Sequence, residues 1–413
     1  MIQRMPRFAL WLLLVLLGSA AFSPAATAVS GGFVRAEGAH LVTEGGDRFR
    51  VKGINLGHWF VPEGYIFGFS RDAEAAGTIT RVFERLLGPE GARRFWTRFH
   101  DGYIREEDIR FIASVGFNTI RLPVDYRMFV GGGLARFQGI DGLALLDRVV
   151  GWAKASGIRV IIDLHAAPGG QVGAAHDGGP GFPLLFYVRA NQDLTVALWR
   201  RIASRYRDEP AVMGYDILNE PIAPHHDTKY LEPRLEPLLK RITAAINAAA
   251  PKQLVFLNGS RWGTSFVALG APFADNLVYT YHSYWASTRR STIQPQLNFR
   301  TRYNVPILIA ETGEAEDEWI VRFRNLHERF DIGWIFWTYK NMNQTTTVVS
   351  IPLPRDWPAI ADAAHRLAHD PEAPIPDRAV IERAFEDYLL GLDLSRCTVR
   401  WSYLAALGLK SAP

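Results

Sequence analysis

The sequence predicts an α/β fold: a closed (β/α)₈ barrel followed by a helical extension. Eight short apolar runs alternate with amphipathic stretches between about residue 40 and residue 345. The runs lack the apolar–polar alternation of a strand with one wet face, so they are typical of parallel strands covered on both faces. Eight strand–helix units favour a closed barrel. An open doubly wound sheet is the alternative, but the first strand-to-helix turn carries no G-x-G-x-x-G sequence.

The predicted strands are rich in Val, Ile, Leu and aromatic residues. In chain order they occupy residues 51–56, 117–124, 158–165, 212–220, 254–259, 277–282, 305–311 and 333–338. Pro221 directly follows the fourth strand, "VMGYDILNE", and ends it because proline has no N–H to donate.

Helices are predicted between these strands. Residues 191–210 place apolar side chains at helical spacing, and Pro210 closes the pattern. Residues 143–157 and 230–250 show the same spacing. The segment 346–413 has helical patterning, several prolines and no strand-like alternation, so we expect it to be a helical extension packed on the barrel.

The N-terminus has the layout of a secretory signal peptide. Arg4 and Arg7 precede an apolar stretch from Phe8 to Leu17, and small residues follow up to Ala28. The apolar stretch is shorter than the ~20 residues of a membrane span, which argues against a membrane anchor. We therefore expect cleavage after Ala28 and a secreted or periplasmic protein without membrane attachment in its mature form. The predicted domains are the signal peptide (1–28), the barrel domain (29–345) and the C-terminal extension (346–413).

Composition excludes several classes of protein. With 48% hydrophobic and 12% aromatic residues the chain can bury a large core, so it is not a disordered protein. A formal charge of +4, with no cluster of Lys and Arg interleaved with aromatics, argues against a nucleic-acid partner. Cys397 is the only cysteine, so an intramolecular disulfide is impossible and the core must hold the fold.

Polar side chains stand at the ends of six of the eight predicted strands. In a (β/α)₈ barrel the carboxyl ends of all strands meet at one face, where active sites form. The residues concerned are Arg121, His165, Asn219 with Glu220, His282 with Tyr284, Glu311 and Trp337. We therefore expect them to share one site.

Glu220 and Glu311 suggest chemistry by a pair of carboxylates. Hydrolysis of an acetal needs a proton for the leaving oxygen and a carboxylate facing the oxocarbenium-like carbon. Glu220 would need a raised pKa to stay protonated, whereas Arg121 beneath Glu311 would keep that carboxylate ionised. Asn219 is suited to hydrogen-bond a sugar 2-hydroxyl.

Six motifs, in this order along the chain, resemble glycoside hydrolase family 5, the cellulase-like retaining β-glycosidases. They are "GFNTIRLPV", "IIDLHAAPGGQ", "ILNEP", "YTYHSYW", "LIAETG" and "IFWTYK". The resemblance covers about residues 33–345. It implies that Glu220 is the acid/base and Glu311 the nucleophile. It also implies a polar shell around the cleaved sugar, with Trp337 as its aromatic floor: Arg121, His165, Asn219, His282 and Tyr284.

Within this family, "GINLGHWFVPEG" and "DLHAAPGGQVG" are most similar to the exo-β-1,3-glucanase branch. That resemblance implies that Glu63 grips the terminal glucose. Two features depart from the branch: His58 replaces a glycine, and "TGEAEDE" follows Glu311.

A metal site made by His165, His282 and the two glutamates is the alternative at this rim. It is disfavoured because no two of them have the i, i+3, i, i+4 or H-x-H spacing of metal ligands. We expect no metal and no organic cofactor. The glycine-rich segment 168–183 is expected to overhang the cleft as a long loop.

The sequence thus predicts a retaining β-glycosidase, a monomer that acts on an oligo- or polysaccharide, a β-glucan or β-glucoside. Three alternatives remain. The substrate could be another β-glycan or glycolipid, such as a β-mannan, a β-1,4-glucan or a galactofuranoside. The enzyme could act as a transglycosylase, or the chain could bind carbohydrate without catalysis.

Overall fold

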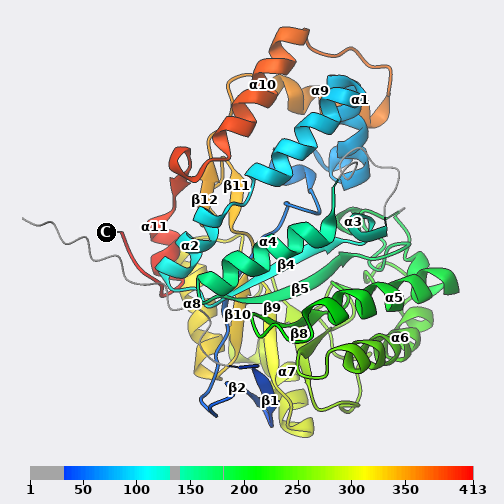
Figure 1. Cartoon of the computed structure of the whole chain (residues 1–413), viewed down its shortest axis with the longest axis vertical. Helices are drawn as coiled ribbons and strands as arrows, with labels where there is room; N and C mark the ends of the chain where they lie inside the picture. The colour runs from blue at the N-terminus through cyan, green and yellow to red at the C-terminus, as the bar shows by residue number, and fades with distance from the viewer. Residues whose placement is uncertain (1–31, 131–139, 180, 413) are drawn as a thin grey trace, which may run out of the picture.

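A closed barrel of eight parallel strands forms the centre of the molecule, shown in Figure 1. The computed structural model describes residues 32–130, 140–179 and 181–412, so the predicted signal peptide lies outside the described residues. The strands pair in the order β10-β3-β4-β5-β6-β7-β8-β9. The predicted fold class is confirmed.

Each predicted apolar run forms one barrel strand. The strands are β3 (Lys52–Asn55), β4 (Thr119–Asp125), β5 (Arg159–Ala166), β6 (Val212–Asp216), β7 (Leu254–Asn258), β8 (Leu277–His282), β9 (Ile307–Glu311) and β10 (Gly333–Phe336). All residues of the seven strands β4 to β10 are buried, as expected for strands covered on both faces.

Helices cover the outside of the barrel. They are α1 (Ala76–Gly102), α2 (Glu106–Val115), α3 (Arg127–Val130), α4 (Gly142–Ala155), α5 (Arg189–Tyr206), α6 (Thr228–Ala249), α7 (Arg290–Tyr303) and α8 (Asp317–Arg329). The connection between β7 and β8, residues 259–276, is fully described and contains no helix. It contains three glycines and one proline, which disfavour a helix, and it folds as a loop with two short bridges.

A hairpin closes the amino-terminal end of the barrel. It consists of β1 (Arg35–Glu37) and β2 (His40–Val42), which lie at the lower end of the molecule in Figure 1. Val34 and Leu41 join a hydrophobic cluster with strand residues such as Val51 and Leu308. The hairpin therefore covers the face opposite the carboxyl ends of the strands.

The C-terminal segment packs on α1 through aromatic rings. It contains α9 (Trp357–His369), α10 (Arg378–Gly391) and α11 (Trp401–Ala406), and α9 and α10 lie beside α1 in Figure 1. Phe385 of α10 meets Phe83 of α1 edge to face, with ring centroids 4.8 Å apart. A small three-stranded sheet also forms, in which β12 (Val349–Ile351) pairs with both β11 (Lys340–Met342) and β13 (Thr398–Val399).

The extension predicted as helical thus also holds strands, which are too short to show periodicity. Among the described residues, no helix is long and apolar enough to span a membrane.

Candidate active site

Arg121 is fully buried beneath the rim as the third residue of β4, four residues before the end of that strand, so it does not lie at the strand end as predicted. Its Nη1 donates to Glu311 Oε1 (2.5 Å) and its Nη2 to Asn219 Oδ1 (2.7 Å). The same guanidinium contacts two carboxylates from neighbouring strands, Asp163 at 3.0 Å and Asp216 at 2.9 Å. One arginine therefore fixes the ends of β5, β6 and β9 relative to one another, with charge-assisted hydrogen bonds that are stronger than neutral ones.

Glu311 ends β9 and faces the cleft with one carboxylate oxygen held on each side. Arg121 binds Oε1, and the Tyr284 hydroxyl donates to Oε2 at 3.0 Å. His282 Nδ1 lies 3.6 Å from the same Oε2. The Glu311 side chain is thus held in one orientation by Arg121, Tyr284 and His282.

Glu220 sits four residues beyond β6, because the strand ends at Asp216 and not, as predicted, at Pro221. It lies in a loop whose backbone is tied to the barrel. The Asn219 N–H donates to Leu164 O (3.1 Å), and Gln171 Nε2 donates to Asn219 O (3.0 Å). Glu220 itself has φ 44°, in the left-handed region that non-glycine residues rarely adopt. Its two oxygens meet two imidazoles: His282 Nδ1 is 2.8 Å from Oε1, and His176 Nε2 is 3.0 Å from Oε2.

The contacts with these imidazoles make the prediction of a raised pKa for Glu220 wrong. Burial raises its pKa, as predicted, but the contacts with His176 and His282 outweigh burial and lower the pKa below its ordinary value. On the other side of the pair, burial lowers the pKa of His176, yet Glu220 reverses this and raises it to about 9. The proton expected on Glu220 is therefore held by an imidazole beside it.

The two glutamates converge. One carboxylate oxygen of Glu220 and one of Glu311 lie within 4.8 Å of each other, with a ring nitrogen of His282 within the same distance of both. This separation belongs with the ~5–5.5 Å carboxyl pairs of retaining glycosidases rather than with the ~6.5–9.5 Å of inverting ones.

His165 and Asn219 form part of the wall behind the glutamates. His165 Nδ1 lies 2.8 Å from Asp163 Oδ2, and burial lowers the pKa of His165 to about 3, so its ring is neutral. Asn219 is fully buried, and like Arg121 it lies behind the surface of the cleft rather than on it. Its amide oxygen is already taken by Arg121.

The cleft has a volume of about 380 Å³. Besides the two glutamates and the histidines, its lining includes aromatic and acidic side chains: Glu63, Tyr65, Trp262, Tyr284, Trp285, Glu314 and Trp337. Trp337 stacks on the His165 ring and donates from Nε1 to the Tyr65 hydroxyl (2.7 Å). The floor of the cleft is therefore an aromatic surface of the kind that a sugar ring can cover.

Glu63 lies in the cleft with a fully buried Oε1 that has no hydrogen-bond partner among the described residues. Burial raises the pKa of Glu63 well above its ordinary value. Its backbone N–H donates to His58 Nδ1 (3.1 Å). His58 has φ 70°, which explains why a glycine suits this position, and burial lowers its pKa to about 3.

Sequence reasoning missed His176, Tyr65 and Glu314. His176 lies in the loop that was predicted to overhang the cleft, but its contact with Glu220 could not be predicted from the sequence. Tyr65 follows Glu63 by two residues, and Glu314 follows Glu311 by three, within the segment that departs from the exo-glucanase pattern.

A (β/α)₈ barrel with two adjacent glutamates at its carboxyl face is a fold and site of the glycoside hydrolase type. Residues 82–343 match the cellulase family, glycosyl hydrolase family 5, and the chain belongs to this family. The predicted family is confirmed.

Two relatives show how far the similarity extends. A β-xylosidase from Phanerodontia chrysosporium is 30% identical over 255 residues, 61% of this chain and 52% of its own. A probable glucan 1,3-β-glucosidase A from Aspergillus clavatus is 29% identical over 237 residues, 57% of this chain and 55% of its own. The chain spans about half the length of the curated relatives it matches.

Solved structures share the fold at low sequence identity. An endogalactoceramidase is 17% identical, with a TM-score of 0.56 over 87% of this chain and 84% of its own. A hyperthermostable endocellulase is 16% identical, with a TM-score of 0.54 over 82% of this chain and 99% of its own.

Proposed function

We propose that the protein is a retaining β-glycosidase that hydrolyses a β-glucan or β-glucoside. The observation that carries the proposal is the pair of oxygens on Glu220 and Glu311, within 4.8 Å at the cleft. The family and the neighbouring aromatic floor support it. Two carboxylates this close leave no room for the water of an inverting reaction, so one of them attacks the sugar directly.

The first step forms a bond between Glu311 and the anomeric carbon. Arg121 and Tyr284 hold the Glu311 carboxylate in position for this attack. The bond from the anomeric carbon to the leaving oxygen breaks, and that oxygen takes a proton from Glu220. Because the resting proton lies on an imidazole, His176 or His282 passes it to Glu220 as the negative leaving oxygen develops.

The second step returns the enzyme to its starting state. Water gives a proton to Glu220 while the oxygen of that water attacks the anomeric carbon, and the bond to Glu311 breaks. Glu220 then returns the proton to the imidazole that supplied it, which restores the starting charges. The sugar leaves with its original configuration. Both steps use side chains of this chain alone, so the proposal needs no metal and no organic cofactor.

Glucose is the favoured sugar, at the end of a chain. The relatives named probable glucan 1,3-β-glucosidase A support a β-1,3-linked glucan. Glu63 supports action at a chain end, because it lines the cleft and its buried Oε1 has no partner among the described residues, so its carboxyl group is available to hydroxyls of a terminal sugar. The relative named β-xylosidase supports a second candidate, a β-xyloside.

A panel of aryl glycosides and oligosaccharides tests the substrate. We expect release of glucose from the non-reducing end of β-1,3-linked oligosaccharides, and faster cleavage of aryl β-glucoside than of the β-xyloside, β-mannoside or galactofuranoside. Faster xyloside cleavage would transfer the proposal to the second candidate. Products longer than the substrate would indicate transfer to sugar, and no cleavage of any member would indicate a carbohydrate-binding protein.

The predicted signal peptide supports export, and we extend the proposal to a secreted or periplasmic monomer. Mass spectrometry of the exported chain would show a new N-terminus after Ala28. A retained leader would contradict this part of the proposal without affecting the chemistry.

A further inference from the structure

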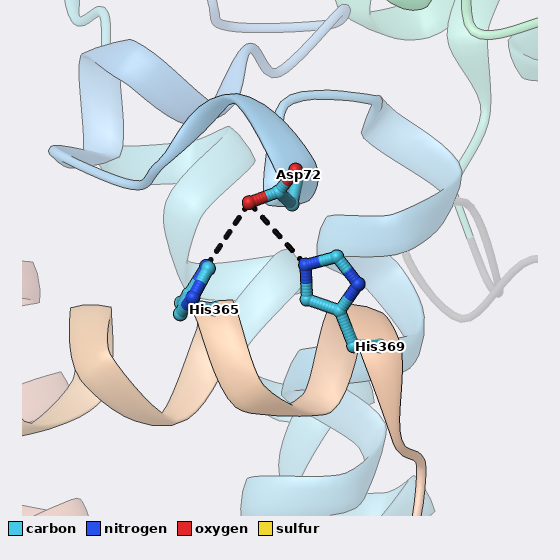
Figure 2. Close-up of side chains that lie close together, drawn as sticks. All are labelled: Asp72, His365 and His369. Atoms are coloured by element: carbon cyan, nitrogen blue, oxygen red, sulfur yellow. Dashed lines mark ion pairs between the residues drawn. The ribbon is translucent and has the colours of Figure 1, made fainter.

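Three metal-binding side chains from distant parts of the chain converge on the surface, away from the cleft. Asp72 lies in the short 3₁₀ helix η2 (Arg71–Ala73), and His365 and His369 lie on α9. Figure 2 shows both rings on the same side of α9, turned towards the Asp72 carboxylate. His365 Nδ1 is 3.0 Å and His369 Nε2 is 3.4 Å from the same oxygen, Asp72 Oδ2.

We propose that these three residues bind one divalent transition-metal cation, Zn²⁺ in the first instance. Zn²⁺ takes imidazole nitrogens and carboxylate oxygens at ~2.0–2.2 Å in a tetrahedron, which places neighbouring ligand atoms roughly 3.3 Å apart. The two contacts with Asp72 already have this spacing, and all three ligand atoms lie within 4.8 Å of one another. Water would fill the fourth position.

The helix supplies a rigid base for two ligands. His365 and His369 are four residues apart, a spacing that puts both on one face of a helix and is used for zinc in H-x₃-H motifs. The opposite face of α9 is fixed in the core by Trp357, Ile360 and Ala364. About half of each ligand side chain is exposed to solvent, so an ion can reach the site without opening the fold.

The site would connect the C-terminal extension to the loop that carries Glu63 and Tyr65. The Gly64 N–H donates to Glu74 O (3.0 Å), which closes this loop around Asp72. Bound metal would hold the loop against α9. The ion is therefore a clamp on the fold and takes no part in the reaction, so this inference does not depend on the proposed function.

Calorimetric titration of Zn²⁺ tests the site. The protein is prepared without a histidine tag, treated with EDTA and dialysed. We expect one zinc per chain, and a melting temperature that rises by a few degrees at about 100 times Kd. His365→Ala, His369→Ala and Asp72→Asn should each weaken binding by about tenfold or more and abolish the thermal shift.

Two control variants make the result decisive. His40→Ala removes a similar histidine–aspartate pair, His40 with Asp331 at 3.0 Å, which lacks a second histidine; zinc affinity should not change. Glu311→Gln removes a ligand of the other possible metal group, in the cleft. Because the three ligand variants lie on two separate elements, misfolding of α9 alone cannot imitate loss of the site.

Any one of three results would overturn the proposal: the absence of a zinc isotherm, unchanged zinc affinity in the three ligand variants, or loss of zinc binding in Glu311→Gln. The last result would place the ion in the cleft. In the first two cases the three side chains would be no more than histidine–aspartate ion pairs.

Discussion

Two clusters in this protein combine histidine and carboxylate at metal-ligand spacing, yet their surroundings give them different chemistry. In the cleft, Glu220, His282 and Glu311 are held by further partners: His176 on Glu220, and Arg121 with Tyr284 on Glu311. A guanidinium already supplies the positive charge there, so the histidines handle protons. In the described part of the chain, the ion pairs of Asp72 are those with His365 and His369. That cluster can accept a cation from solvent.

The comparison teaches that residue type and spacing alone do not assign chemistry. Burial and the nearest fixed charge decide between proton transfer and metal binding. The following changes test the cleft side of the comparison, in order of decreasing effect.

Glu311→Ala should reduce kcat on an aryl β-glucoside by on the order of 10⁴-fold or more, because the attacking carboxylate is lost. Added azide should restore turnover and give product of inverted configuration. Glu382→Gln, which removes an exposed carboxylate paired with Arg378 on α10, is the control and should leave the rate unchanged. Full activity of Glu311→Ala would contradict the mechanism.

Glu63→Ala should lower kcat/KM by about 10- to 100-fold, the effect of deleting a buried polar group that binds substrate. Burial raises the pKa of Glu63, so the neutral acid is the form that Gln imitates. Glu63→Gln should therefore stay within about fivefold of the parent at pH 6. Equal losses in both variants would show that the charged form binds the sugar.

His176→Asn should change the pH profile of kcat/KM. The pKa of His176 is raised to about 9 in the folded protein, so the proton shared with Glu220 is retained from neutral pH up to about pH 9. Without the imidazole this proton is not retained at alkaline pH, so the alkaline limb of the pH profile should move to lower pH. We expect about a tenfold loss at pH 8 and a smaller loss at pH 6. A uniform loss at every pH would indicate a steric role only.

The sign of the stability effect follows from the same pair. Because the folded pKa of His176 lies above its ordinary value of 6.5, its ion pair stabilises the protein fully below pH 6.5 and is lost as pH rises through about 9. The difference in melting temperature between the parent and His176→Asn should therefore shrink between pH 6.5 and pH 9. A difference that grows over this range would contradict the ion pair.

Trp285→Ala should have the smallest effect. This ring is 67% exposed at the mouth of the cleft, where it can cover only sugars beyond the cleaved bond. Loss of one aromatic contact is worth about 0.5–1.5 kcal/mol, or roughly 2- to 10-fold in KM. The loss should appear with long oligosaccharides and not with aryl glucosides.

Local patterns explain why so much was predictable. A strand buried on both faces must be a continuous apolar run, so all eight strands could be found from the sequence. A barrel then brings every strand end to one face, which places Glu220 and Glu311 together from topology alone. The short strands β12 and β13 were not predicted, because they are defined by pairing with distant segments, β12 with β11 and β13 with β12, rather than by any periodicity of their own.

What the sequence by itself determined is the barrel, its family and the two glutamates, because these follow from periodicity and from motifs within one segment. The tertiary structure alone decided the charge state of Glu220 and the meeting of Asp72 with α9. Both depend on contacts between residues far apart in the chain, and electrostatic energy follows distance in space rather than position in sequence. The i, i+4 pair His365 and His369 was visible in "HRLAH", but its third ligand was not.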